Sequence, residues 1–147
     1  AINSSNALHW DDPVRTYIDD CNRGKDGLRG RMFNMRWTGS PVADFYRILA
    51  RGGIYLQPGD RRREFRRGRL RLVYEANPLA WVVEQAGGAA STGRERVLEV
   101  RPDKLHQRTP LIAGSRAEVE HVARLHDGRQ IRGERSPLFS RRGLLRF

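Results

Sequence analysis

The sequence predicts an α/β fold of three layers, in which helices cover both faces of a central parallel or mixed sheet. Short segments rich in apolar, β-favouring residues alternate along the chain with segments whose apolar residues recur at helical spacing. The helical segments also begin at capping residues or prolines, and glycines follow most of them. With 147 residues, 38% of them hydrophobic, the chain is long enough for one domain with a real core.

The first third of the chain predicts two helices separated by a loop. Residues 1–10 lack a clear period and should form a strand end and a loop. Asp11, Asp12 and Pro13 then give a helix start, and the expected buried face comprises Val14, Tyr17, Ile18 and Cys21. After a basic loop with several glycines, Ser40 caps the second helix, whose expected apolar stripe comprises Val42, Phe45, Ile48 and Leu49.

The middle of the chain predicts a strand, an arginine-rich loop, a second strand and a helix. Residues 54–57 have the pattern of the first strand, and 58–68 that of an exposed loop. The apolar residues of 70–73 predict a second strand of about five or six residues. Asn77 can cap the helix that follows, with a proline at its first position and two glycines after its end.

Glu75 is the candidate functional residue of this central unit. It would lie at the carboxyl end of a strand, just before a helix begins. Ligands bind at that place in open α/β sheets, because side chains converge there and helix N-termini favour anions. On the local pattern alone, an ordinary turn or capping residue is the alternative interpretation.

The last part of the chain predicts further short strands and one helix. Residues 89–92 and 97–100 have β-like patterns, and 111–113 should form a buried strand. Ser115 and Glu118 have the spacing of a capping box, which opens a helix with Val119, Val122, Ala123 and His126 on one side. We therefore expect a domain over residues 1–127 and a basic tail over residues 128–147.

The charge of the chain is strongly positive, at a formal value of +11, and only Lys25 and Lys104 are lysines. Such a balance suggests an anionic partner, either a phosphorylated metabolite, a nucleic acid or an acidic subunit. A coding preference of the source genome would give the same excess of arginine. The single cysteine excludes an intramolecular disulfide, and no apolar run is long enough for a bilayer. A cytoplasmic protein without a membrane partner is expected.

Several segments, taken in order, resemble class I fructose-1,6-bisphosphatases. The most specific is GRLRLVYEANP at residues 68–78, which VEQAGG follows at 83–88. The others lie at residues 1–3, 36–44, 51–56, 93–96, 105–108 and 136–139. The resemblance spans essentially the whole chain but only the C-terminal half of the family's subunit. It implies an α/β sugar-phosphatase fold whose C-terminal half holds the sugar and the 6-phosphate.

The resemblance implies roles for four residues. Asn3 would donate a hydrogen bond to the 6-phosphate of the substrate, although a turn asparagine is the alternative. Arg36 would reach the 6-phosphate of a neighbouring subunit, which implies a homo-oligomer, expected to be a tetramer; a solvated arginine is the alternative. Arg69 stands at a lysine position that touches the sugar. Glu75 would help to bind the Mg²⁺ or Mn²⁺ that the family uses to hydrolyse fructose 1,6-bisphosphate.

The chain also departs from the family's pattern at the expected substrate site. Asn6 and Gln57 stand where tyrosine hydroxyls commonly contact the 6-phosphate, and Trp37 replaces a further tyrosine. Asn and Gln can still donate hydrogen bonds, whereas Trp can donate only through its indole N–H. Pro41 occupies a position often filled by methionine. These changes imply a pocket that is weakened or adapted to another phosphorylated sugar.

Three hypotheses for the function follow. In the first, the chain is the sugar-phosphate-binding half of a fructose-1,6-bisphosphatase and is inactive without the N-terminal half that holds the other metal-binding carboxylates. In the second, it is a truncated, non-catalytic domain that binds phosphorylated sugars or pairs with full-length subunits. In the third, the arginines of residues 61–71 bind nucleic acid, which is the least favoured because no nucleic-acid-binding fold signature accompanies them.

Overall fold

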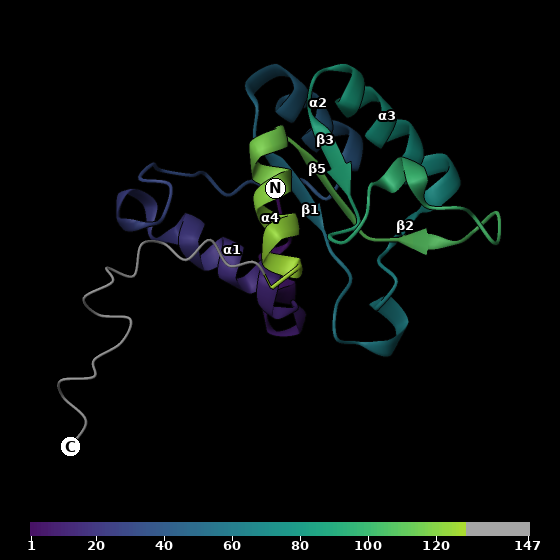
Figure 1. Cartoon of the computed structure of the whole chain (residues 1–147), viewed down its shortest axis with the longest axis horizontal. Coiled ribbons are helices and arrows are strands. Elements are labelled where there is room, and N and C mark those ends of the chain that lie inside the picture. The colour runs from purple at the N-terminus through teal and green to yellow at the C-terminus, as the bar shows by residue number, and fades with distance from the viewer. Residues whose placement is uncertain (129–147) are drawn as a thin grey trace.

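The computed structural model describes residues 1–128 and confirms the predicted α/β/α layers (Figure 1). The expected tail and the 136–139 motif lie beyond these residues, apart from Gly128. The helices are α1 (Asp12–Asn22), α2 (Pro41–Arg51), α3 (Asn77–Gln85) and α4 (Arg116–His126). The strands are β1 (Ile54–Gln57), β2 (Leu70–Arg71), β3 (Ala89–Ser91), β4 (Arg108–Thr109) and β5 (Leu111–Gly114).

The central sheet has the order β1-β5-β3, and both strand pairs are antiparallel. Ile2 adds a parallel bridge to Leu56 on the outer edge of β1, which makes the sheet mixed. A separate two-stranded sheet pairs β2 with β4. Of the two predicted possibilities, the mixed sheet is therefore correct and the purely parallel sheet is wrong.

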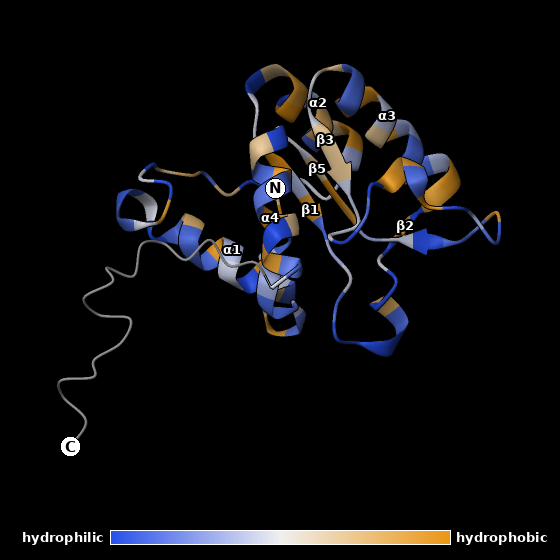
Figure 2. Cartoon of the chain, in the orientation of Figure 1, coloured by the Kyte–Doolittle hydropathy of each residue, from blue (hydrophilic) through white to orange (hydrophobic). Residues whose placement is uncertain are grey.

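Two apolar clusters lie on opposite faces of the sheet, because successive strand residues point to opposite sides. Along β1, Tyr55 points to one face, and Ile54 and Leu56 point to the other. The first face is covered by α2 and α3 through Phe45, Ile48, Ala80 and Val83. The second face is covered by α1 and α4 through Val14, Tyr17, Ile18, Val119 and Val122. Figure 2 shows the apolar strands between these layers.

The predicted limits of α2 are confirmed. The Ser40 hydroxyl accepts a hydrogen bond from the N–H of Ala43, at 3.5 Å, and a proline occupies the first turn. Gly52 ends the helix with a φ of 76°, a conformation that favours glycine. The expected stripe of this helix is only half correct, because Phe45 and Ile48 are buried while Val42 and Leu49 are exposed.

The predicted strand at residues 70–73 is wrong beyond Arg71. Residues 72–76 instead form a π-helical turn that runs directly into α3. Asn77 has helical φ and ψ angles of −61° and −48°, so it lies inside the continuous helix and does not cap it. The buried side chains here recur at helical spacing from the start of the turn: Leu72, Ala76, Ala80 and Val83. Burial of side chains at helical spacing outweighs the preference of residues 70–73 for a strand.

Two smaller predictions are also wrong. Residues Val97–Glu99 form a short 3₁₀ helix and not a strand. Ser115 precedes α4, but its hydroxyl accepts a hydrogen bond from the N–H of Gly53, at 3.0 Å, instead of capping the helix. Glu118, the other expected member of that capping box, binds Tyr17 and two arginines.

None of the helices within residues 1–128 has the length and apolar character needed to cross a bilayer.

Candidate functional site

A small pocket beside β1 brings together four of the seven predicted site residues. It lies between the N-terminal segment, the end of β1 and the start of β2, and the predicted residues in its lining are Asn3, Asn6, Gln57 and Arg69. These residues come from three segments, of which the first and the last are more than 60 positions apart in the sequence, so the fold is needed to assemble them. Trp10 and Asp60 also line the pocket, together with the apolar residues Ile2, Leu56 and Pro58.

Asn3 has a structural role that leaves its amide group available. Its side-chain oxygen accepts hydrogen bonds from the N–H of Ser5, at 3.1 Å, and from the Ser5 hydroxyl, at 2.6 Å. These contacts cap a 3₁₀ helix, η1 (Ser4–His9). The backbone N–H can only donate, so the oxygen faces the helix and the NH₂ group is directed elsewhere. The two interpretations of Asn3, turn residue and ligand donor, are thus compatible.

In Asn6 and Gln57, as in Asn3, the side-chain oxygen accepts a hydrogen bond from the protein. The oxygen of Asn6 accepts a hydrogen bond from a guanidinium N–H of Arg62, at 3.1 Å. The oxygen of Gln57 accepts one from the Tyr55 hydroxyl, at 3.0 Å. Burial, followed by the charges of two carboxylates, raises the pKa of Tyr55, so its hydroxyl stays protonated and able to donate. Within residues 1–128 neither NH₂ group donates to another side chain.

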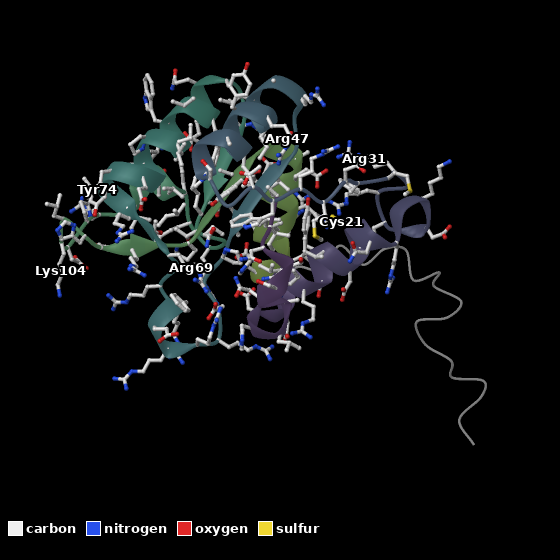
Figure 3. The ribbon with its side chains drawn as sticks, turned by 180° about the vertical axis from the view of Figure 1, so that it is seen from behind. Cys21, Arg31, Arg47, Arg69, Tyr74 and Lys104 are labelled. Atoms are coloured by element: carbon white, nitrogen blue, oxygen red, sulfur yellow. The ribbon has the colours of Figure 1, made fainter. Side chains whose placement is uncertain are left out.

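Arg69 is held in place by an aromatic ring and a carboxylate. Its guanidinium lies over the ring of Phe65, 3.6 Å from the centroid, and one nitrogen lies 3.7 Å from an oxygen of Asp60. Arg62 also lies over Phe65 and makes hydrogen bonds of 2.9 and 3.2 Å to the same carboxylate from its N–H and its Nε. Figure 3 shows Arg69 where the arginine-rich loop joins the body of the fold.

Asp60 organises these arginines from a buried position, at 7% exposure. Burial alone would raise the pKa of Asp60, but hydrogen bonds from Arg62 and the charge of Arg69 outweigh it and hold the pKa below its usual range. The carboxylate is therefore ionised near neutral pH. It fixes the direction of Arg69 but offsets only part of the positive charge of two guanidinium groups.

The arrangement can bind an anion. Three amide side chains and one guanidinium line the pocket beside the Asp60 carboxylate, and their N–H groups are the kind of donor that holds a phosphate. The enclosed volume is only about 10 Å³, comparable to the space that one water molecule needs. A phosphate group would therefore sit at the mouth of the pocket.

The structure does not bring the other three predicted residues into this pocket. Trp37 stacks on Tyr55, with ring centroids 5.8 Å apart, and does not line the pocket. Arg36 is exposed and lines a separate, larger hollow between α1 and α2, together with Arg31, Arg47 and Arg51. Figure 3 shows Arg31, Arg47 and Cys21 around this second hollow.

Glu75 lies apart from the pocket that contains Arg69. Its carboxylate accepts a hydrogen bond from the N–H of Arg71, at 2.6 Å, and lies 3.8 Å from the Arg71 guanidinium. Tyr74, which precedes it, is well separated from Arg69 in Figure 3. Glu75 does not line the pocket that contains Arg69, so this pocket is not the expected cleft shared by the two residues.

These residues do not fit a complete metal site. No group of three or more His, Cys, Asp or Glu side chains in the described part of the chain has the geometry to hold a metal ion. Glu75 offers one carboxylate, and Arg71 places a positive charge beside it. Mg²⁺ requires six oxygen ligands, so any further protein ligands would have to come from outside these residues.

Three residues of the site were missed in the sequence. Asp60, Arg62 and Phe65 lie in the loop that was predicted to be exposed, and they form the support of Arg69. Asp60 could have been noticed as an isolated acid at the start of a run of arginines. Nothing in the local pattern indicates that Phe65 turns back under the guanidinium groups.

Comparison with known proteins gives the family. The profile described as "Fructose-1-6-bisphosphatase, C-terminal domain" matches residues 1–127. This chain belongs to the fructose-1,6-bisphosphatase family. A "Fructose-1,6-bisphosphatase class 1" of Methylorubrum extorquens and one of Rhizobium meliloti are each 56% identical to it over 146 residues. A relative from Nitrobacter hamburgensis, "Fructose-1,6-bisphosphatase class 1 2", is 57% identical over 147 residues.

The matches cover nearly all of this chain but less than half of each relative. Each match includes 99% of this chain but only 42% or 43% of the relative, so the chain spans about two fifths of the length of the bisphosphatases it matches. The resemblance seen in the sequence is thus confirmed as a match to the C-terminal domain of the family. The pocket around Asn3 and Arg69 lies inside the matched region.

Proposed function

We propose that this chain is the sugar-phosphate-binding portion of a class 1 fructose-1,6-bisphosphatase. In this proposal the pocket around Asn3 and Arg69 binds the 6-phosphate of fructose 1,6-bisphosphate, and the 1-phosphate is hydrolysed outside the pocket. The unit concerned is the domain over residues 1–127, with residues 128–147 as a basic tail. The proposed location of the enzyme is the cytoplasm.

The observation that supports the proposal is the orientation of the three amides. The oxygens of Asn3, Asn6 and Gln57 each accept a hydrogen bond from the protein, and within residues 1–128 their NH₂ groups donate to no other side chain, so these NH₂ groups are available to a ligand. Such a pocket favours phosphate oxygens over groups that donate hydrogen bonds. Arg69 adds the only guanidinium of the pocket lining, on a rigid support.

The remaining predicted residues have proposed roles at other places. Arg36 would reach the 6-phosphate of a neighbouring subunit in a homo-oligomer, proposed to be a tetramer, since it is exposed and does not line the pocket of its own chain. Trp37 would support Gln57 through Tyr55. Glu75 would lend one oxygen to Mg²⁺ or Mn²⁺, with the other ligands supplied by the N-terminal half of the enzyme.

Calorimetric titration of the chain with fructose 6-phosphate tests the proposal. Binding should occur, and fructose 1-phosphate and fructose should bind at least about tenfold more weakly, because they lack the 6-phosphate. Arg69→Ala should weaken fructose 6-phosphate by about tenfold or more. Arg63→Ala is the matched control, because Arg63 is exposed in the same loop and does not line the pocket.

A non-catalytic domain that binds phosphorylated sugars is the alternative, and it predicts the same titration. The bisphosphatase proposal and the non-catalytic alternative differ in whether adding the rest of a bisphosphatase produces turnover of fructose 1,6-bisphosphate. Equal affinity for fructose 6-phosphate and fructose 1-phosphate, unaffected by Arg69→Ala, would contradict both.

A further inference from the structure

A third hollow lies beside the arginine-rich loop of residues 58–68, and we call it the loop hollow. Its volume is about 440 Å³, and its walls include that loop, the turn at residues 92–95, the segment 107–110 and the end of α4. Figure 1 shows the loop between β1 and β2 at the same end of the molecule at which α4 ends. Of the described residues, only Pro58 and Asp60 line both this hollow and the small pocket that contains Arg69. The loop hollow is large enough for a small-molecule ligand.

The loop hollow presents arginines that no acidic side chain compensates. The arginines in its lining are Arg61, Arg66, Arg67 and Arg94, and all four are exposed. Arg61 forms an ion pair of 2.5 Å with Asp12. In the described part of the chain, the guanidinium groups of the other three form no ion pair and no hydrogen bond. They are therefore available to an anion from outside the protein.

The carboxylates of the lining offset only part of this charge. Asp60 is held by two arginines that do not belong to the lining. One oxygen of Asp11 lies 3.1 Å from Nε2 of His126, and the other is shielded from solvent. Glu95 is the one acid of the lining without an ion-pair partner among residues 1–128. Three uncompensated arginines thus face one uncompensated carboxylate, which leaves the hollow positively charged.

The turn that carries Arg94 is held in place by its backbone. Gly93 has a φ of +103°, and a Cβ there would lie 2.9 Å from Nε2 of His126, so the turn packs directly against the last turn of α4. The N–H of Gly93 donates a hydrogen bond to the hydroxyl of Ser91, at 2.9 Å. The backbone position of Arg94 is therefore fixed before any ligand binds, which lowers the entropy cost of binding.

The loop that carries Arg66 and Arg67 is also closed by backbone hydrogen bonds. The carbonyl of Phe65 accepts one from the N–H of Asp60, at 3.2 Å, and one from the N–H of Gly68, at 2.9 Å. The two arginines follow this closure directly in the sequence. Both arginine-bearing walls of the loop hollow thus have a fixed backbone.

The neutral part of the lining favours a phosphate chain over a nucleobase. The side-chain oxygen of Gln107 accepts a hydrogen bond from the N–H of Asp103, at 2.6 Å, and within residues 1–128 its NH₂ group donates to no other side chain. This amide and the guanidinium groups are donors suited to phosphate oxygens. No Phe, Tyr or Trp occurs among the described residues of the lining, so a base would have no such ring on which to stack.

We propose that the loop hollow binds a small polyphosphate, a chain of two or three linked phosphate groups. Arg66 and Arg67 belong to one wall and Arg94 to another, so a ligand that contacts both walls needs more than one anionic group. Inorganic triphosphate and the triphosphate of a nucleotide carry the same chain. The proposal does not depend on the proposed function, because this ligand is neither the substrate nor the sugar product of the bisphosphatase reaction.

Calorimetric titration of the chain with inorganic triphosphate tests the proposal, in about 150 mM salt and without Mg²⁺, so that weak surface attraction is screened. Triphosphate should bind, and orthophosphate should bind at least about tenfold more weakly, because it cannot contact both walls. Arg66→Ala combined with Arg94→Ala should weaken triphosphate by at least about tenfold. Arg23→Ala combined with Arg63→Ala is the control, since it removes the same charge from exposed positions outside the hollow and should leave binding unchanged. Thermal denaturation followed by circular dichroism verifies that both variants fold.

Labelling of arginines with phenylglyoxal, read by mass spectrometry, gives a second measurement that needs no variant. Triphosphate should protect Arg66, Arg67 and Arg94 and leave Arg63 reactive. No binding of triphosphate, unchanged labelling, or equal weakening by the control pair would overturn the proposal. Competition by fructose 6-phosphate, or loss of triphosphate binding in Arg69→Ala, would also overturn it, because the ligand would then occupy the small pocket.

ATP and a single-stranded oligonucleotide distinguish the possible carriers of the phosphate chain. ATP should bind within about threefold of inorganic triphosphate, because no aromatic side chain in the described lining recognises a base. ATP that binds more than about tenfold tighter would overturn the proposal, since the base and sugar would then carry the recognition. An oligonucleotide that displaces triphosphate and binds less tightly to the control pair would overturn it in favour of a nucleic-acid surface.

Discussion

At the scale of single residues, His126 links α4 to the start of α1. Its Nδ1 lies 3.0 Å from the carbonyl of Val122, and its Nε2 lies 3.1 Å from the carboxylate of Asp11. Burial lowers the pKa of His126 and the charge of Arg94 lowers it further, but the hydrogen bonds to Asp11 and Val122 outweigh both and raise it above the usual 6.5.

This pKa predicts a pH-dependent contribution to stability. Because the folded pKa is raised, the contribution is fully present below pH 6.5 and is lost as the pH rises through the folded pKa. His126→Gln should therefore cost more stability at pH 5.5 than at pH 8.5, as measured by urea unfolding. Burial also lowers the pKa of His121, and comparing the unmodified protein with His126→Gln at each pH removes the effect of that second histidine. An equal cost at both values would contradict the prediction.

Gly68 shows why one position tolerates only glycine. It has a φ of +79°, and a Cβ there would lie 2.2 Å from the backbone of Thr109. Gly68→Ala should therefore destabilise the protein by more than about 2 kcal/mol, since it adds a clash between β2 and β4 to the backbone strain. Gly87→Ala is the control, because its φ is +86° and nothing lies within 4 Å. It should cost about 1 kcal/mol, and similar costs for both variants would count against the clash.

At the scale of elements, Glu118 joins α4 to α1 and to the loop after it. Its carboxylate accepts a hydrogen bond of 2.6 Å from the Tyr17 hydroxyl and forms ion pairs with Arg29 and Arg31. Both Glu118 and the Arg29 side chain are largely shielded from water, so removing the charge leaves a guanidinium without its main counter-ion.

Glu118→Gln should consequently lower the free energy of unfolding by about 3 kcal/mol. Glu120→Gln, on the exposed side of the same helix, should change it by less than about 0.5 kcal/mol. Urea denaturation of both variants measures the difference. A small effect at Glu118 would show that Asp20, which also binds Arg29 at 3.1 Å, is a sufficient counter-ion.

The elements were predictable where two independent signals agreed. A cap, a proline and a glycine end defined α2 together with its apolar period, and the limits of this helix are confirmed. The segment 70–73 gave conflicting signals, because its residues favour strands while the burial of Leu72 and Ala76 follows a helical period. Tertiary packing decided that conflict, and no local pattern contains that information.

At the scale of the whole molecule, the resemblance predicted which residues lie together better than the local patterns did. It grouped Asn3, Asn6, Gln57 and Arg69, and the structure brings these four together. The support of Arg69 by Asp60 and Phe65 could not be predicted, because it depends on how the arginine-rich loop folds back. The exposure of Val42 and Leu49 could not be predicted either, since an apolar stripe does not show which of its residues face the core.

The separation of Glu75 from the phosphate pocket leads to a prediction for turnover. One carboxylate beside Arg71 cannot hold Mg²⁺ by itself, so the isolated chain should release no phosphate from fructose 1,6-bisphosphate above the buffer rate. Adding the unmatched portion of the Methylorubrum extorquens relative should produce turnover. Glu75→Gln should then lower this turnover by about tenfold or more while leaving fructose 6-phosphate binding by the chain alone unchanged. Glu64→Gln, in the exposed loop, is the control. Robust turnover by the isolated chain would show instead that residues 1–147 hold a complete hydrolytic site, and the proposed division between the two portions would be wrong.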